Sequence, residues 1–522
     1  MKKLQKLAAL LLALMFIVSS CGNSQEKEPV SSPETKEESK DEKQDDKKEE
    51  KSEENGGSAT LKIGVMFAPT DTLDPIYASS AGGMILVMSL YDSLSTISEK
   101  GATLRLAESI TPNETFDEYK IVLRENAKFS DGTPVTGKDA LDSLAYLVTS
   151  PLYQVMYGGV DFENSSAEGN TLTLKLKTPA SDFLESCLSM FSPVGKEGKF
   201  EGIGAGGYFV ESGDSQTGYK LKRNEHYYGG APEIAEVTLL NIADSNSKAQ
   251  ALLTGEIDYA WGLDTAAIQT LKGNDEIELP ESSFDSAAIL DLTLNTRMAP
   301  FNDPELRRAA KLVIDREKLV KTILGDYGEV GNDMIGKGYA DYPDDIEQTV
   351  MNKEEAKKIF EAKGVKSFTI VTSDVSGGLN NATKIMAQDF SDIGVEVKIE
   401  EMDPQSYYAN FAELYKKEAF VSFWINRLSI TNLKNQIIKD GPYNTSGYYS
   451  DITETNYKKA LSVGAGKEQN EYIKAVQKDI HDNGGNIVWG YQKNISARRK
   501  GVECETTQTI PWLSGAKFHP EN

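Results

Sequence analysis

The residue types that carry most enzyme chemistry are few in this sequence, and their spacing matches no common catalytic or metal-binding motif. The chain of 522 residues has three histidines, His226, His481 and His519, and contains neither an HExxH motif nor a CxxC pair. Those patterns are the usual sequence signs of a bound metal ion. A hydrolytic triad usually needs a histidine base, and the Gly-x-Ser-x-Gly elbow that presents a nucleophilic serine is also missing. The sequence therefore predicts a protein that is not an enzyme and that has no metal site and no cofactor.

One glycine-rich stretch, Gly202 to Gly207, has the spacing of a dinucleotide-binding loop. Such a loop follows a buried strand and opens a helix. Here the preceding residues do not read as a buried strand, and the following residues, Tyr208 to Ser212, alternate as a strand does. We therefore interpret the stretch as a turn that leads into a β-strand.

Cys21 has the context of a lipid-attachment site. A basic start and an apolar run from Leu7 to Val18 form an export signal, because the run is shorter than the roughly 20 residues of a membrane-spanning helix. Ser19 and Ser20 then lead into Cys21, and this string resembles a bacterial lipobox, in which the cysteine carries lipid and begins the mature chain. The alternative is an ordinary signal peptide, residues 1–20, followed by an incidental cysteine.

Residues 21–58 are expected to form a disordered tether. They consist mainly of Glu, Lys, Asp and Ser, with few apolar residues and no periodicity, so they cannot bury enough surface to offset the cost of ordering. A flexible segment of about 35 residues reaches on the order of 30 Å. The segment therefore predicts a folded body that is held near a membrane but away from its surface.

The composition of the remaining chain bounds its class. From residue 59 onwards the chain is longer than one hydrophobic core usually sustains, which predicts two or more lobes. A net charge of −24 argues against nucleic-acid binding, which needs a basic surface. Two further cysteines, Cys187 and Cys504, lie far apart in the sequence, and we expect buried free thiols there; a disulfide bridge is the alternative.

The folded body reads as a mixed α/β protein. Strands are predicted at 61–67, 103–107, 119–123, 171–176, 208–212, 219–223, 237–241, 257–260, 288–293, 367–372, 395–400, 420–425 and within 487–498. Helices are predicted at 84–94, 138–149, 245–253, 304–312, 315–324, 353–362, 382–393 and 468–482. The strand–helix–strand order over 367–400 predicts parallel pairing of its two strands.

Several segments of the body, in order, resemble the family 5 solute-binding proteins of oligopeptide, dipeptide and nickel importers of the ABC type, here in lipoprotein form. The segments are Leu73–Pro75 with Leu90–Leu94, Phe129–Thr136 with Asp139-Ala140, Gly206–Tyr208 with Leu221–Pro232, Ala249–Asp258, Leu294–Thr296 with Pro300–Ala309 and Ile314–Arg316, and Gly441–Tyr448. Each motif is modest, but the ordered set covers nearly the whole body.

This resemblance implies a periplasmic-binding-protein-like α/β fold with two lobes, a hinge and an extra domain inserted in lobe 1. The ligand would be enclosed between the lobes by hinge closure. We expect lobe 1 at 59–90, 203–286 and 487–522, the inserted domain at 91–202 and lobe 2 at 287–486. The implied protein is a monomer on the outer face of the bacterial cell membrane, held there by its lipid alone, that delivers a peptide or peptide-like solute to the transmembrane subunits of an ABC permease.

The resemblance also implies where a ligand would bind. In peptide-binding members, the loop after Leu-Asp-Pro pairs its backbone with an extended ligand. In this chain the loop contains Ser79, Ser80 and Ala81, whose small side chains suit a close approach; the alternative is a plain flexible loop. Trp261 and Trp424 are candidates for stacking on the ligand, although core packing explains Trp261 equally well.

A second ligand segment departs from the family pattern. Peptide binders usually carry Trp-x-x-Asp near the hinge, and the Asp binds the free amino group of the peptide, whereas this chain has Trp424-Ile425-Asn426-Arg427. A guanidinium repels an ammonium and suits a carboxylate or phosphate, while Asn426 could orient a ligand. We therefore hypothesise an acidic or modified peptide, or another anionic solute, that is not held by its α-amino group as a standard peptide is. Alternatively, another acid fills the role of the missing Asp, or the alignment slips by a residue or two.

Other functions stay open at this point. The same scaffold could bind a nickel–chelator complex or a sugar, and a sensor or pheromone receptor would share the binding chemistry. A surface-anchored hydrolase is disfavoured by the missing motifs.

Overall fold

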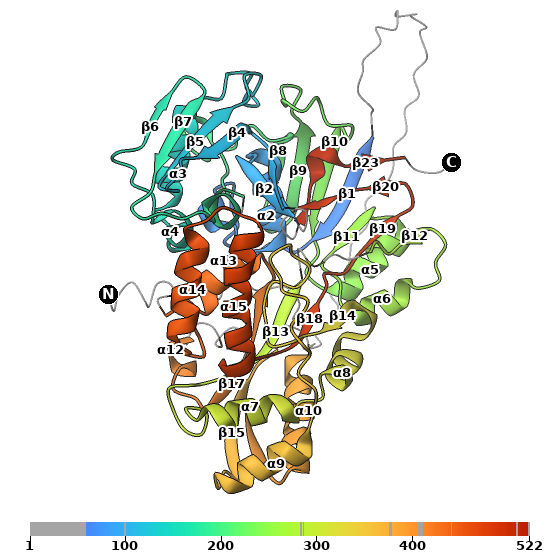
Figure 1. Ribbon diagram of the computed structural model, residues 1–522. Helices are drawn as coiled ribbons and strands as arrows, with labels where there is room; N and C mark the ends of the chain where they lie inside the picture. The colour runs from blue at the N-terminus through green and yellow to red at the C-terminus, as the bar shows by residue number, and fades with distance from the viewer. Residues whose placement is uncertain are drawn as a thin grey trace, which may run out of the picture.

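The computed structural model describes residues 59–519 except 99–100, 190, 282–283, 285–286, 375–377, 404–406, 408–410, 440 and 508–509. The predicted signal peptide, the predicted lipidation site Cys21 and the predicted tether lie outside the described residues. Within the described part, no helix combines the length and the apolar character needed to cross a membrane. This part contains two large mixed sheets with helices packed on them, and a smaller unit beside the first sheet (Figure 1).

The first sheet forms the centre of lobe 1 and has the N-terminal strand β1 in its middle. β1 runs parallel to both of its neighbours, β10 and β11, and the strands farther out pair antiparallel. In spatial order the strands are β12 (Ile277–Glu278), β19 (Ser496–Arg499), β11 (Tyr259–Trp261), β1 (Thr60–Val65), β10 (Glu236–Asn241), β9 (Gly218–Arg223) and β8 (Tyr208–Asp214). Helices α2 (Ala81–Leu90), α5 (Ser245–Thr254) and α6 (Thr265–Leu271) and the turn η1 (Pro75–Tyr77) belong to this lobe.

The second sheet forms the centre of lobe 2 and has six strands. In spatial order they are β14 (Gly328–Val330), β18 (Asn486–Gln492), β13 (Ala288–Leu294), β17 (Ala419–Ile425), β15 (Ser367–Thr372) and β16 (Glu396–Glu401). The helices of this lobe are α7 (Pro304–Val313), α8 (Arg316–Leu319) with η4 (Val320–Leu324), α9 (Lys353–Ala362), α10 (Leu379–Asp392), α12 (Phe411–Leu414), α13 (Ser429–Gln436), α14 (Asp451–Leu461) and α15 (Lys467–Asn483). Residues 289 to 294 of β13 are buried, as expected for a central strand that is covered on both faces.

Local signals in the sequence set the ends of several of these elements. Asp303 accepts a hydrogen bond from the backbone N–H of Glu305 at the start of α7, and Pro304 fills the first helical position. Gly255 ends α5 in the left-handed conformation, with a φ of 76°. Strands β15 and β16 pair in parallel around α10, which confirms the prediction for that segment.

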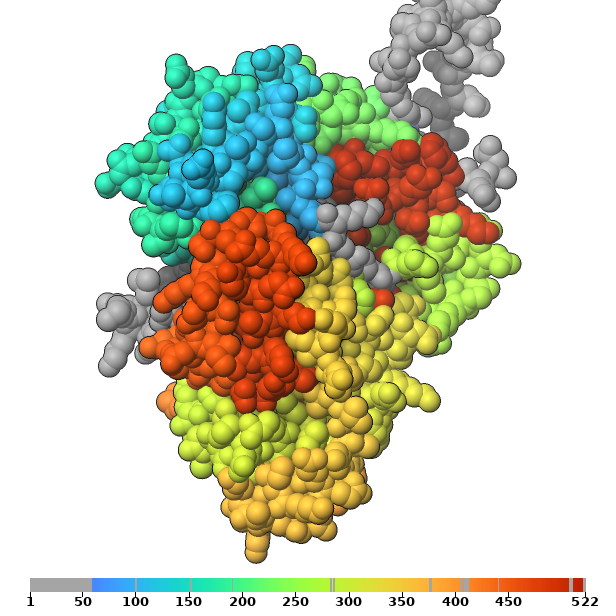
Figure 2. Space-filling model, viewed as in Figure 1, coloured from blue at the N-terminus to red at the C-terminus, as the bar shows by residue number. Residues whose placement is uncertain are grey.

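The inserted domain lies between α2 and β8 in the chain, and its core is continuous with the core of lobe 1. Its sheet contains β4 (Ala107–Pro112), β5 (Glu118–Leu123), β7 (Thr171–Lys175) and β6 (Ser166–Glu168), in that order, and it carries helices α3 (Gly137–Leu147) and α4 (Pro151–Tyr157). A single π-helical turn, η2 (Leu184–Leu188), follows the sheet. On the face in view, the surface of helices α13 to α15 meets the surface of this domain (Figure 2).

The point at which the chain returns to lobe 1 differs from the prediction. The expected return is at residue 487, but β18 pairs with β13 and β14 in the second sheet. The chain joins the first sheet again only with β19, which pairs with β11. This boundary is wrong by one strand, because the apolar run that includes Ile487 and Val488 indicates burial but does not indicate which sheet the strand joins.

Two smaller expectations are confirmed. The stretch from Gly202 to Gly207 is a turn that leads into β8, and a side chain at Gly204 would collide with the carbonyl oxygen of Leu90. Cys187 and Cys504 are both free thiols; the first is buried and the second half-buried rather than buried as expected. Burial raises the pKa of each thiol to about 12, so both are inert at neutral pH.

Candidate functional site

Asn426 lies directly after β17, at the junction between the two sheets. Its side-chain amide donates hydrogen bonds to the carbonyl oxygens of Phe284 at 3.0 Å and Lys337 at 2.8 Å. Its backbone N–H donates to the carbonyl oxygen of Ala287 at 2.8 Å. Since Phe284 and Ala287 belong to the segment that connects the first sheet with the second, Asn426 fixes the end of β17 to this crossing. The amide oxygen of Asn426 is buried and has no hydrogen-bond partner among the described residues.

Arg427 carries an unpaired charge at the same junction. Its side chain is half-buried, and no hydrogen bond or ion pair joins its guanidinium to any residue that the structure describes. Burial lowers the pKa of Arg427, and the phenol groups of Tyr339 and Tyr443 act in the opposite direction. A guanidinium nevertheless stays charged in proteins. The guanidinium is thus a partly desolvated cation with no counter-charge among the residues that the structure describes, an arrangement that a bound anion would stabilise.

Trp424 is mostly buried and supports a neighbouring aromatic ring. Its side chain is 6% exposed, and its indole N–H donates to the hydroxyl of Ser422 at 3.1 Å. The ring of the half-buried Tyr443 lies 5.6 Å from the Trp424 ring, measured between centroids. Ser422 in turn donates to the buried carboxylate of Asp291, whose pKa burial raises to about 6. Trp424 therefore has little surface of its own to offer a ligand, whereas Tyr443 is accessible beside Arg427.

The candidate loop in lobe 1 is held by Asp71. The carboxylate of Asp71 accepts hydrogen bonds from the backbone N–H of Ser79 at 2.7 Å and from the hydroxyls of Ser79 and Ser80. The hydroxyl of Ser80 also accepts from the backbone N–H of Gly83 and so caps α2. Both serine side chains thus serve the loop itself, while Ser79 and Ala81 remain half-buried at its surface.

Trp261 belongs to the core of lobe 1. It is 5% exposed on β11, the strand beside the central β1, and its ring contacts that of Tyr259 edge-on at 6.1 Å. Core packing, the alternative for this residue, therefore accounts for its position. Of the predicted residues, the structure brings Trp424, Asn426 and Arg427 together at the end of β17, and it places Ser79, Ser80 and Ala81 together in the other lobe.

The sequence reasoning missed a direct contact between the inserted domain and lobe 2. The hydroxyls of Ser186 and Thr431 lie 2.8 Å apart, and the Lys434 ammonium lies 3.8 Å from the Asp182 carboxylate. Ser181 adds contacts to lobe 2, since its hydroxyl donates to the carbonyl oxygen of Ala460 at 3.1 Å. These residues come from η2 and the residues just before it on one side and from α13 and α14 on the other, and the only sequence signal for them is their polarity.

Glu185, within η2, is a further charged residue next to this contact. Its side chain is half-buried, and no ion pair joins its carboxylate to a cation among the described residues. Burial raises the pKa of Glu185 to about 7; the carboxylates of Asp182 and Asp341 raise it further, and a backbone hydrogen bond opposes them. At neutral pH this carboxyl group is therefore poised between its charged and neutral forms.

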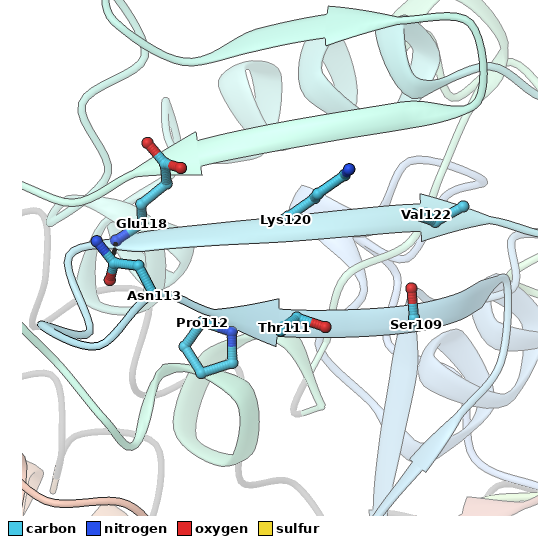
Figure 3. Close-up of a pocket in the computed structure, with 7 residues that line it drawn as sticks. All are labelled: Ser109, Thr111, Pro112, Asn113, Glu118, Lys120 and Val122. Carbon is cyan, nitrogen blue, oxygen red and sulfur yellow. Dashed lines mark hydrogen bonds between the residues drawn. The ribbon is translucent and has the colours of Figure 1, made fainter.

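A shallow pocket on the inserted domain lies apart from these residues. Figure 3 shows that it is formed by the neighbouring strands β4 and β5 and the turn that joins them. Its volume is about 370 Å³, and it is lined by Ser109, Thr111, Pro112, Asn113, Glu118, Lys120 and Val122. None of the predicted ligand residues lines it, and Glu118 and Lys120 are ordinary outward-facing residues of an exposed sheet face.

Comparison with known proteins decides the family. Residues 102–431 match the model of "Bacterial extracellular solute-binding proteins, family 5 Middle". The chain belongs to this family. The glutathione-binding protein GsiB of Escherichia coli is 24% identical over 459 residues, covering 83% of this chain and 89% of that protein. The solved structure of the substrate-binding protein CtaP from Listeria monocytogenes has a TM-score of 0.78 at 20% identity, covering 89% of this chain and all of that one. NikZ from Campylobacter jejuni, solved with Ni(L-His), has a TM-score of 0.72 at 18% identity, covering 88% and 97%.

Family 5 membership confirms the family and the two-lobe binding-protein fold that the sequence motifs predict, and the lipoprotein form stays a prediction. As a family 5 solute-binding protein, the chain is an extracytoplasmic substrate-binding component of the ABC importer type. Its relatives in these comparisons are binding proteins rather than enzymes.

Proposed function

We propose that this protein captures an acidic, peptide-like solute between its lobes by binding a carboxylate of the solute at Arg427, and that it delivers the solute to an ABC permease. The observation that carries the proposal is the half-buried guanidinium of Arg427, which has no partner among the described residues at the junction of the two sheets. The paired N–H groups of a guanidinium match the two oxygens of a carboxylate and hold it through two parallel hydrogen bonds.

The class of solute follows from this anchor and from one relative. GsiB is named as a glutathione-binding protein, and glutathione is a modified peptide with two carboxylates and one amino group. A ligand of this kind supplies the anion that Arg427 lacks. Among the described residues, no group of three or more His, Cys, Asp and Glu side chains could hold a metal ion. A nickel complex would therefore have to bring most of its own metal ligands.

Closure of the lobes would be coupled to this anchor through Asn426. Asn426 is bonded to the crossing segment at Phe284, and Arg427 is the next residue in the chain. A ligand that is bound by Arg427 and by groups of lobe 1 favours the closed arrangement by its differential affinity for that state. The lipid on Cys21 and the charged tether would keep the protein at the outer face of the cell membrane, within reach of the permease.

Isothermal titration tests the anchor directly. Glutathione, an acidic tripeptide and glutathione diethyl ester are titrated into the wild-type protein, into Arg427→Met and into Arg308→Met, which removes an exposed arginine of α7. We expect Arg427→Met to weaken binding of at least one acid by about 100-fold, because truncating a desolvated charge partner costs about 2–5 kcal/mol. The diethyl ester should bind the wild-type protein equally poorly, and Arg308→Met should behave as wild type.

Two results would overturn the proposal. One is an Arg427→Met variant that binds the acids as tightly as the wild-type protein does. The other is a wild-type protein that binds neither glutathione nor acidic peptides.

A further inference from the structure

The inserted domain meets lobe 2 through polar groups. Among the described residues, one cluster of buried apolar side chains spans the inserted domain and lobe 1, and a separate cluster belongs to lobe 2. At the contact between them, Ser181 and Ser186 of the inserted domain and Thr431 and Gln469 of lobe 2 are all buried. Figure 2 shows the seam at which the surface of helices α13 to α15 meets that of the domain. The two parts are therefore separate bodies that share a polar interface.

The buried polar groups of this interface are paired across it. The hydroxyls of Ser186 and Thr431 lie 2.8 Å apart, and the side-chain amide of Gln469 donates to the hydroxyl of Ser181 at 3.1 Å. The backbone N–H of Ser181 donates to the carbonyl oxygen of Leu461 at 3.1 Å. Water can replace such bonds when the surfaces part, so a polar interface within one chain can open and close. We call the residues that form it the clasp: Ser181, Asp182 and Ser186 on one side and Thr431, Lys434 and Gln469 on the other.

The clasp holds the helix that begins beside the proposed carboxylate anchor. Helix α13 starts two residues after Arg427, with Thr431 in its first turn and Lys434 in its second. On the other side, Ser186 belongs to η2, and single π-helical turns of this kind are frequent at functional sites. When the inserted domain moves away from lobe 2, both contacts with α13 must break. Opening of the clasp therefore changes the surroundings of Arg427.

We propose that the clasp is a gate for the solute, so that the solute reaches and leaves Arg427 only while the clasp is open. This inference rests on the proposed function, because it concerns access to the same site. A solute that is held by its own contacts alone leaves at a rate that those contacts set. The clasp adds bonds between protein groups that have to break first, so its strength sets how long a bound solute stays.

A reversible disulfide across the clasp tests the gate. The hydroxyl oxygens of Ser186 and Thr431 are 2.8 Å apart, which places their Cβ atoms near the separation of about 3.5–4.5 Å that a disulfide needs. Ser186→Cys and Thr431→Cys are introduced together into full-length Cys187→Ser protein, which lacks the neighbouring buried thiol, and diamide oxidises the pair. The control carries Ser186→Cys alone in the same background. The probe is labelled S-methylglutathione, which keeps both carboxylates of glutathione but has no thiol that would reduce the bond.

Oxidation should trap a probe that is already bound and exclude one that is added later. We expect both release and uptake to slow by about 10-fold or more in the oxidised double variant and to recover after reduction, because a locked gate blocks both directions. The single-cysteine control should exchange the probe equally fast in both states. Unchanged exchange in the oxidised double variant, or a folded double variant that forms no disulfide, would overturn the gate and leave the proposed function standing. A reduced protein that binds no probe would overturn the proposed function and this inference with it.

Single substitutions weaken the clasp without a crosslink, so the test does not depend on the cysteine variants folding. Thr431→Val removes one hydroxyl of the pair with Ser186, and Lys434→Met removes the cation beside Asp182. Each should release the bound probe about 10-fold faster than the wild-type protein, since removing one partner of a buried polar contact acts mainly on the dissociation rate. Lys458→Met, at an exposed position of α14, should release it at the wild-type rate. Displacement by excess unlabelled probe measures these rates, and thermal melting confirms that each variant is folded. Wild-type release rates in both clasp variants would contradict the gate.

Discussion

Asp182 of the inserted domain and Lys434 of α13 lie 3.8 Å apart and form an ion pair between the two parts of the molecule that a ligand would separate or join. The Asp182 side chain is completely buried in this pair, whereas the Lys434 side chain keeps 31% of its surface exposed. The Asp182 carboxylate is the largest contribution to the raised pKa of Lys434. The pair therefore forms only when the inserted domain and α13 are in contact.

Removing the lysine should weaken this contact between the inserted domain and lobe 2. Lys434→Met leaves the Asp182 carboxylate buried without a counter-charge, which we expect to cost about 1–3 kcal/mol. Urea denaturation measures this loss, and ligand affinity should fall in parallel, because opening then competes with binding. The double variant Asp182→Asn, Lys434→Met should recover part of the loss, whereas Lys458→Met, an exposed lysine of α14, should change neither quantity. Additive losses in the double variant would show that the two residues are not coupled.

A negative charge at position 426 should destabilise the protein more than truncation of the Asn426 side chain does. Asn426→Ala leaves the carbonyl oxygens of Phe284 and Lys337 without their donor, at a cost of about 1–3 kcal/mol. Asn426→Asp should cost more, because a carboxylate oxygen would then face these two carbonyl oxygens. Chemical denaturation of both variants, beside Asn246→Asp at an exposed position, gives the comparison. An aspartate variant that is as stable as wild type would mean that the amide does not hold the crossing segment.

Asp291 should give the stability of lobe 2 a specific pH dependence. Burial raises the pKa of this carboxyl from 3.8 to about 6, while hydrogen bonds from Ser422, Asn486 and Thr293 oppose the shift. Between these two pH values the folded protein binds more protons than the unfolded chain, so its stability falls as the pH rises. The contribution amounts to roughly 3 kcal/mol over this interval.

Urea denaturation from pH 4 to pH 7 measures this effect as a difference in slope. The free energy of unfolding of Asp291→Asn should fall less steeply with rising pH than that of the wild-type protein. Asp344→Asn, at an exposed position, should follow the wild-type curve. Parallel curves for wild type and Asp291→Asn would show that Asp291 keeps an ordinary pKa.

The lipid anchor can be tested independently of the ligand. Cys21→Ser removes the only thiol of the predicted lipobox, so the protein should be released into the medium and should no longer incorporate labelled palmitate. Cys187→Ser, which removes a buried thiol of the inserted domain, should remain lipidated and in the detergent phase of a Triton X-114 partition. A Cys21→Ser protein that still partitions into detergent would exclude this anchor.

The chain by itself determined the features that depend on neighbouring residues. Asp303 and Pro304 start α7 and Gly255 ends α5, because capping groups and backbone conformation act within one turn of chain. The family could also be identified from ordered motifs, and the departure at Arg427 was visible as a single substitution in one of them. Helices α13 and α14 were missed, since their apolar residues do not follow a clear helical period in a polar segment.

Only the tertiary structure decided which of these segments meet. The sequence analysis placed β18 in lobe 1, whereas the strand pairs with β13 in lobe 2. An apolar run indicates that a strand is buried, but it does not indicate with which strand it pairs. Asp182 and Lys434 lie far apart in the sequence. They come together only because the inserted domain packs on α13. Glu185 is one glutamate among many in the sequence. Its half-buried position and its raised pKa both arise from the protein that surrounds it.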